Sequence, residues 1–266
     1  MTATAIPLIT PVRAGSFNGQ PVAASLDYVE TASGAAAGDT VPANGLTLVT
    51  IDNTAGTTQT FTATSTAAPP FGRTLDVASY SQATTIRSAL LQSNSPAGWA
   101  NADGTFHYLA SNVGQKYAAF SIPGTGAPWA GTSVTQAGRT AIQPEIPNGP
   151  LTGPQNGSPT QWPIGAQPNA LALDFVFTAM DNVNGNCIIM NGPLLLLFTD
   201  SGSNTMTISS VPDYLGRSND VTAYAVGSGL FSAIYVPVVG YRQTNGYLYL
   251  TASNAAVKVV AFACPG

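Results

Sequence analysis

Short segments of alternating apolar and polar residues recur along the chain, separated by clusters of Gly, Asn, Asp and Pro. Four such segments lie at 46–51, 60–64, 105–109 and 257–262, and all are rich in β-branched or aromatic residues. A period of two with these boundaries indicates β-strands. Several short strands at this spacing are typical of a sandwich, a barrel or a jelly roll. The pattern therefore predicts an all-β protein.

Turn residues support the strand assignment, and one segment leaves an alternative open. Asp103-Gly104 and Asn245-Gly246 come directly before two expected strands, where a type I′ turn requires positive φ and so favours Asn-Gly or Asp-Gly. Segment 81–94 places Ile86, Leu90 and Leu91 at helical spacing. A short helix remains an alternative there.

The two halves of the chain resemble each other. "ASNVGQKYAAFSIPG" at 110–124 and "ASNAAVKVVAFACPG" at 252–266 are identical at eight of fifteen positions. Upstream, "LDYVETASGAAAGDTVPANG" at 26–45 aligns without gaps to "LDFVFTAMDNVNGNCIIMNG" at 173–192. Similarity at a fixed spacing indicates repeated structural units.

The alignment sets the expected domain boundaries. We predict two tandem, duplicated β-sandwich domains of jelly-roll-like type at 21–124 and 168–266. In a superposition of the two copies, Asn44-Gly45 is expected over Asn191-Gly192, and Phe120 over Phe262.

The remaining segments, 1–20 and 125–167, lack alternation and contain many prolines. Proline fixes φ and removes a backbone donor, which favours an extended path. The second segment could be a flexible linker or an arm ordered on a neighbouring surface, and Trp129 and Trp162 favour the arm. We expect both segments to be extended arms that contribute little to a core and are mobile in the isolated protein.

Composition narrows the possible partners. Charged residues make up 8% of the chain, against about 25% in ordinary soluble domains. The net charge of −4 and the scattered arginines argue against nucleic-acid binding, which requires concentrated Lys and Arg. The longest apolar run, 193–198, is far shorter than a membrane-spanning helix, and the start lacks the pattern of a secretory signal. A neutral surface rich in hydroxyl and amide groups is suited to being covered by another protein.

The chain offers few residues for chemistry. Its single histidine is His107 and its two glutamates are Glu30 and Glu145, which supply neither a nucleophile triad nor a convincing acid/base pair. We expect no catalytic, metal or cofactor site, and no enzyme. Cys187 and Cys264 are expected as buried free thiols, with a disulfide as the alternative.

Two polar motifs are interpreted as structural. The segment 181–186, "DNVNGN", has the composition of a turn and lacks the spacing of an EF-hand. The pattern G-R-x-x-D occurs in both halves, as Arg73 with Asp76 and as Arg217 with Asp220. Each pair is expected to form a local ion pair or to brace a turn beside a strand.

The order of motifs resembles a known family. An Asn-Gly lead-in to a strand ("NGLTLVTIDN") is followed by a Thr-alternating strand ("TQTFTAT"), by "GR…D", by a D/N-G turn and by a last strand near Pro-Gly. This is similar to the small β-domain of tailed-phage capsid decoration (cement) proteins. The resemblance implies a virion protein on the capsid exterior, assembled in the host cytoplasm. Its expected partners are the major capsid protein and further copies of itself, with a trimer favoured.

Two other functions stay open. Tandem similar domains are also what a shell-forming double jelly-roll capsid protein needs. A head or tail fibre module could instead bind host glycans through exposed aromatics such as Tyr241 and Tyr247.

Overall fold

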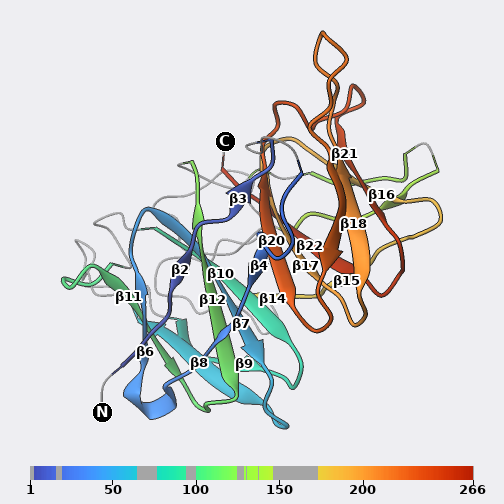
Figure 1. Ribbon diagram of the computed structural model, residues 1–266. Helices are drawn as coiled ribbons and strands as arrows, with labels where there is room; N and C mark the ends of the chain where they lie inside the picture. The colour runs from blue at the N-terminus through green and yellow to red at the C-terminus, as the bar shows by residue number, and fades with distance from the viewer. Residues whose placement is uncertain are drawn as a thin grey trace. The chain divides into compact units, whose positions relative to one another are not determined.

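The computed structural model describes residues 3–15, 20–64, 77–93, 100–124, 129, 131–136, 138–145 and 173–265. Within these residues the regular elements are β-strands, apart from one three-residue 3-10 helix at Ala35–Ala37. The all-β prediction is therefore confirmed. The chain forms two compact units, coloured mainly blue to green and yellow to red in Figure 1. Unit 1 comprises Met1–Thr10, Glu30–Ala127 and Pro147–Val176, and unit 2 comprises Pro11–Val29, Pro128–Ile146 and Phe177–Gly266.

Unit 1 is a sandwich of two sheets. The first has the order β1 (Thr4–Ala5), β6 (Asp39–Pro42), β11 (Thr105–Ala110), β8 (Gln59–Thr64), β9 (Val77–Gln82). The second has the order β14 (Asp174–Phe175), β10 (Arg87–Ser93), β7 (Leu46–Asn53), β12 (Gln115–Ile122), β2 (Leu8–Ile9), with β5 (Thr31–Ala32) also paired to β12.

Unit 2 has the same layered construction. Its first sheet has the order β13 (Thr140–Ala141), β16 (Asn186–Ile189), β21 (Tyr247–Ala252), β18 (Asn204–Ser209), β19 (Val221–Val226). Its second has the order β15 (Thr178–Ala179), β22 (Lys258–Ala263), β17 (Leu194–Thr199), β20 (Phe231–Val236), β3 (Val12–Arg13), with β4 (Asp27–Tyr28) also paired to β20.

The first sheets of the two units also share a local irregularity. In each unit the hairpin of the first sheet, β8–β9 or β18–β19, contains a register shift typical of a β-bulge. Ser79 and Ala223 lie at these bulges with φ of 50° and 49°, a conformation that costs a non-glycine residue energy. Their backbone N–H groups donate to the hydroxyls of Thr62 and Thr207, respectively. Residue-by-residue superposition of the two copies stays a prediction.

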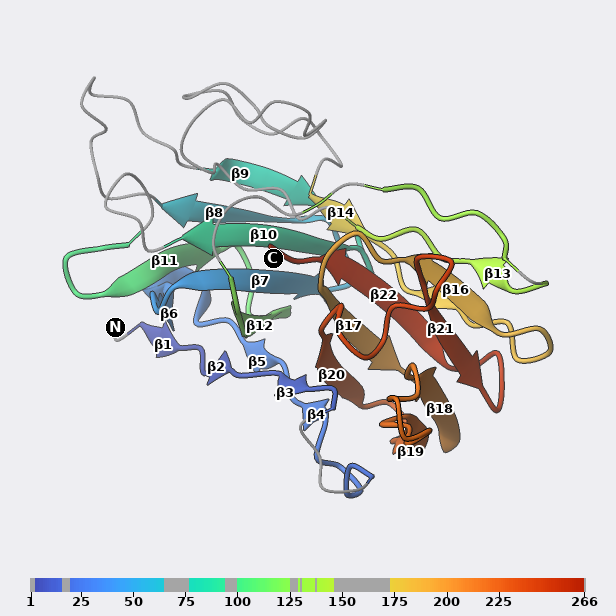
Figure 2. The ribbon, with the colours of Figure 1, turned by 90° about the horizontal axis from the view of Figure 1, so that it is seen from above.

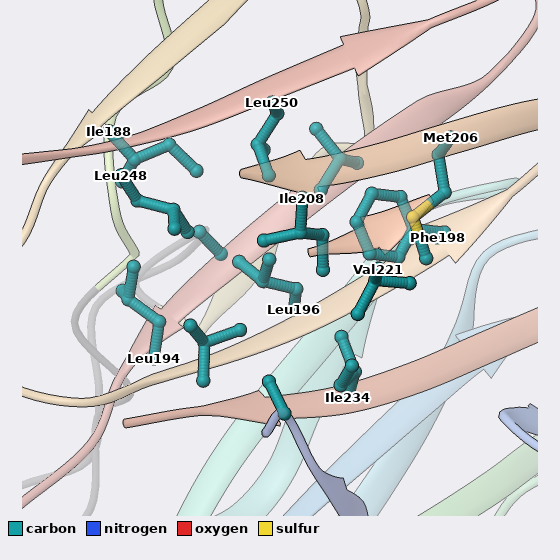
Figure 3. Packing of buried hydrophobic residues seen from close by; sticks show 14 of the residues in the cluster. Ile188, Leu194, Leu196, Phe198, Met206, Ile208, Val221, Ile234, Leu248 and Leu250 are labelled. Atoms are coloured by element: carbon teal, nitrogen blue, oxygen red, sulfur yellow. The ribbon is translucent and has the colours of Figure 1, made fainter. Parts of the chain in front are cut away.

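The core of each unit lies between its two sheets. In unit 2 the second sheet contributes Leu194, Leu196 and Phe198 from β17, and they meet side chains such as Ile208 and Leu250 from the first sheet (Figure 3). The apolar run at 193–198 thus becomes a buried strand, as expected of a continuous apolar segment bounded by turns. Unit 1 has an equivalent core that includes Phe61, Phe106 and Tyr117.

Each unit contains a short strand from the other half of the sequence. Strand β4, from the first half, pairs antiparallel with β20 of unit 2, so that Tyr28 faces Phe231. Strand β14, from the second half, pairs antiparallel with β10 of unit 1, so that Phe175 faces Arg87. Figure 2 shows β14 beside β10. The units therefore differ from the contiguous ranges 21–124 and 168–266 that the alignment suggests.

The described parts of the arms include short strands and contribute to the cores. Strands β1 and β2 of the N-terminal segment pair parallel with β6 and β12, and β3 pairs parallel with β20. Ile6, between β1 and β2, is 1% exposed and belongs to the core of unit 1. In unit 2, β13 occupies the position of β1, and Ile142 is 3% exposed in its core. The expectation of arms without a core contribution is wrong for these residues, and Trp162 lies outside the described residues.

The segment 81–94 contains no helix in its described part. It forms the end of β9 and the whole of β10. Leu90 and Leu91 are both buried although they are consecutive, and only Leu90 belongs to the core cluster between the sheets. Burial at two consecutive strand positions produces apolar spacing that resembles a helical pattern.

Candidate functional site

The short strand that each unit receives from the other half of the sequence carries a half-buried carboxylate. In unit 2, Oδ1 of Asp27 on β4 accepts hydrogen bonds from the hydroxyls of Tyr224 (3.0 Å) and Ser232 (2.6 Å). The Tyr224 oxygen also accepts a bond from the N–H of Leu26 (3.0 Å), and the Leu26 carbonyl accepts from the N–H of Ala233 (2.8 Å). Burial raises the pKa of Tyr224 to about 12, so its hydroxyl remains a donor at neutral pH.

Unit 1 repeats this arrangement with the strand from the second half. Oδ1 of Asp174 accepts from the hydroxyls of Tyr80 (3.0 Å) and Ser88 (2.7 Å). The Tyr80 oxygen accepts from the N–H of Leu173 (3.0 Å), whose carbonyl accepts from the N–H of Ala89 (2.8 Å). We call each receiving element a strand slot: Tyr80, Ser88 and the edge of β10 in unit 1, and Tyr224, Ser232 and the edge of β20 in unit 2.

A strand slot combines two forms of recognition. Main-chain hydrogen bonds hold an extended segment along a sheet edge, while the tyrosine and serine hydroxyls select a carboxylate at one position. Both occupants have the sequence Leu-Asp-aromatic, as Leu26-Asp27-Tyr28 and Leu173-Asp174-Phe175. Sequence comparison aligned these residues, but it could not show that each lies in the opposite unit.

An ionic cluster lies on the second sheet of unit 1. The register places Asp52 on β7 opposite Arg87 on β10 and Lys116 on β12. Nη2 of Arg87 donates to Oδ2 of Asp52 at 2.5 Å. Glu30 joins this group, and burial together with the negative Asp52 raises the pKa of the Glu30 carboxyl to about 7. Burial also raises the pKa of Asp52.

The corresponding place in unit 2 is largely aromatic. There Thr199 faces Phe231 and Lys258 across the sheet, and the rings of Phe177 and Phe231 lie 6.1 Å apart. The ring of Tyr28 stacks on Phe231 at 5.6 Å. These equivalent positions of the second sheet are ionic in unit 1 and aromatic in unit 2. What they have in common is therefore the packing of side chains across neighbouring strands.

The ionic cluster does not have the geometry of a glycosidase. Such enzymes separate two carboxyls by roughly 5 to 9.5 Å around the reacting sugar. The carboxyls of Glu30 and Asp52 instead lie within hydrogen-bonding reach of each other. Glu145, the other glutamate considered, is held by its backbone against Ala261 and Ala263 of β22.

Most acidic side chains brace the fold. Among the acidic residues that the structure describes, nine accept hydrogen bonds from other protein groups: Asp27, Asp39, Asp52, Asp103, Asp174, Asp181, Asp200, Asp213 and Asp220. These bonds fix turns, strand ends and the strand slots. The few negative charges are therefore committed to structure.

The described aspartates of the polar motifs noted in the sequence also accept hydrogen bonds that hold turns in place. Asp181, at the start of "DNVNGN", accepts from the N–H groups of Val183 and Asn184, which confirms the turn. Arg217 does not pair with Asp220: its Nη2 lies 2.7 Å from Oδ2 of Asp213, while Asp220 accepts from Ser210. The ion-pair alternative for Arg217 and Asp220 is therefore wrong and turn bracing holds. Arg73 and Asp76 lie outside the described residues.

The remaining residues considered for chemistry are His107 in unit 1 and two cysteines in unit 2. Nε2 of His107 on β11 lies 3.1 Å from Oδ2 of Asp103, which is in the exposed turn before this strand. Cys187 and Cys264 are both buried and free, which confirms the free-thiol interpretation, and burial raises the pKa of Cys264 to about 12.

One end of unit 2 presents apolar side chains on braced loops. The loops between β18 and β19 and between β20 and β21 are joined by the N–H of Val211, which donates to the Gly240 carbonyl at 2.7 Å. On them, Tyr214, Leu215 and Val239 are 92%, 60% and 85% exposed. We call these three side chains the loop tip. The ion pair between Asp213 and Arg217 flanks two of them.

The aromatics expected to be exposed are buried instead. Tyr241 and Tyr247 are 2% and 8% exposed. The Tyr241 hydroxyl donates to the Asn219 carbonyl at 2.6 Å, which draws this side chain inward beneath the loop tip. The glycan-binding alternative therefore loses the two residues named for it. Strand alternation could not predict the burial of Tyr241, because this residue lies in the loop between β20 and β21, whereas Tyr247 begins β21.

Comparison with known proteins gives no match among family models, curated proteins or solved structures. Among the described residues, no group of three or more His, Cys, Asp or Glu side chains could hold a metal ion. In the same part of the chain, no helix has the length and apolar character needed to cross a membrane.

Proposed function

We propose that this chain is a virion structural protein that decorates and stabilises an icosahedral phage capsid by binding the outer surface of its major capsid subunits. The observation that carries the proposal is the character of the exterior. The acidic groups are few and mostly committed to internal bonds, whereas large apolar side chains such as Tyr214, Val183 and Val239 are more than 80% exposed. Such a surface can be covered by protein with little cost for desolvating charge.

The loop tip is the contact that this proposal favours. Burying exposed apolar area contributes about 25 cal/mol per Å², and braced loops lose little conformational entropy on binding. Decoration stabilises the shell by mass action, because the protein binds assembled shell and not its dissociated subunits. Repetition of the contact over a symmetric shell, and through a homo-oligomer such as a trimer, adds avidity.

The test uses capsids purified without this chain. Wild-type protein should co-sediment with them to saturation and raise the temperature at which they release their contents. The double variant Tyr214→Ala/Leu215→Ala should bind at least tenfold more weakly, whereas Val183→Ala, an exposed apolar change on another turn, should bind like wild type. No binding by the wild-type protein would overturn the proposal.

The same preparation separates the shell-forming alternative. A decoration protein leaves a closed shell, seen in negative stain, when it is absent. If the chain alone assembled into shells, or if particles without it had no shell, the chain would be the capsid subunit and decoration would be the wrong function.

A further inference from the structure

We propose that the strand slots are recognition sites for a Leu-Asp-aromatic strand, and that a second copy of this chain can supply that strand by exchanging β4 or β14 between molecules. The proposal goes beyond decoration and does not depend on it. It starts from the match between the two slots described above. In both, a tyrosine and a serine hydroxyl donate to one aspartate oxygen, and the same two backbone bonds flank it.

The occupants come from remote parts of the sequence. Asp27 lies 197 residues from Tyr224 and 205 residues from Ser232. Asp174 lies 94 residues from Tyr80 and 86 from Ser88. No slot is therefore filled by a locally folded hairpin, and nothing in the slot's bonds distinguishes a strand of the same molecule from that of another.

The connection that follows each of the two strands, and that would change during exchange, is short. Two residues, Val29 and Glu30, separate β4 in unit 2 from β5 in unit 1. Two residues, Val176 and Phe177, separate β14 in unit 1 from β15 in unit 2. Short hinge segments between paired elements favour exchange of those elements between molecules.

Mass action decides between the two arrangements. Exchange between molecules preserves every bond of the slot, so the intramolecular form is favoured mainly by its tether. A tether of this kind supplies an effective concentration on the order of 1 mM. Copies crowded on a surface, or concentrated in solution, reach that range and should then exchange strands.

Split cysteines test the exchange directly. One copy carries only Tyr28→Cys and an isotope-labelled copy carries only Phe231→Cys, at positions that face each other across β4 and β20. The copies are unfolded together, refolded at ~1 µM and at ~1 mM, and oxidised. Exchange predicts a disulfide-linked heterodimer whose yield rises at least tenfold over this range, with the link located by mass spectrometry.

Two controls make every outcome informative. Tyr28→Cys mixed with Val183→Cys, an exposed site outside the slot, reports random collision. The double variant Tyr28→Cys/Phe231→Cys should form an intrachain link at ~1 µM. Its failure would show that β4 does not occupy this slot. Heterodimer yields no higher than the collision control, for this pair and for the pair Phe175→Cys with Arg87→Cys in the other slot, would overturn the proposal.

Discussion

Replacing Asp27, in the first half of the chain, should destabilise the unit built mainly from the second half. Asp27→Ala removes an acceptor that takes bonds of 2.6 and 3.0 Å from Ser232 and Tyr224. Ser232 is fully buried, so its hydroxyl would lose its acceptor without gaining water. A buried donor left without a partner costs about 1–3 kcal/mol. With two donors affected, we expect a loss of about 2–4 kcal/mol.

Hydrogen exchange followed by mass spectrometry locates the loss. Each 1.36 kcal/mol corresponds to a factor of ten in an equilibrium constant. Amides that exchange only when unit 2 opens should therefore exchange about 30 to 1,000 times faster. The affected peptides are those of β17, β20 and β22. The mirror variant Asp174→Ala should accelerate exchange in β7, β10 and β12 instead, and Asp103→Ala, in an exposed turn, should change little.

The result that refutes the reasoning is hydrogen exchange that becomes faster in β7 and β12 but stays unchanged in β17 and β20 on replacement of Asp27. That outcome would place β4 on the unit encoded by its own half of the sequence. A double-mutant cycle adds a second criterion. Asp27→Ala and Tyr224→Phe should show a coupling free energy of about 1–3 kcal/mol because they share one hydrogen bond. Additive effects would contradict the contact.

Three further predictions concern other parts of the fold. Ile6→Ala should lower the free energy of unfolding by about 2–5 kcal/mol in a urea titration, whereas a mobile arm would give no change. Gly192→Ala should cost about 1–3 kcal/mol, because a methyl group there would collide with the ring of Trp129, while Gly56→Ala, which meets open space, should be neutral in the same assay. The carboxyl of Glu30 has a pKa of about 7 in the fold against an ordinary 4.5, so the folded state holds its proton more tightly and stability should fall as pH rises from about 4.5 to about 7. Glu30→Gln should flatten that slope in thermal melts recorded across this range, and an unchanged slope would contradict the assignment.

The sequence predicted the parts of the fold that depend on local chemistry. Gly104 and Gly246 follow Asp and Asn in two matching turns, and both have positive φ. The placement of β4 in unit 2 was not predictable in this way, because the partners of Asp27 are about 200 residues distant in the sequence and no local pattern encodes them. One signal was present: Thr-Ala-Ile occurs at 4–6 and again at 140–142. Its recurrence indicates that the arms belong to the repeated pattern, with a buried isoleucine in each.

The crossing of β4 and β14 between the two halves of one chain also links the stabilities of the two units. The free energy released when β4 enters its slot belongs to unit 2, yet the strand is held in place only while its flanking segments are ordered, including β5 of unit 1. The reverse holds for β14 and β15. Unfolding of either unit therefore removes a strand from the other. Two independent domains would melt in two steps, but this coupling should merge the steps into one transition, and Asp27→Ala should separate them. A wild-type chain that already melts in two well-resolved calorimetric steps would show that the strands contribute too little to couple the units.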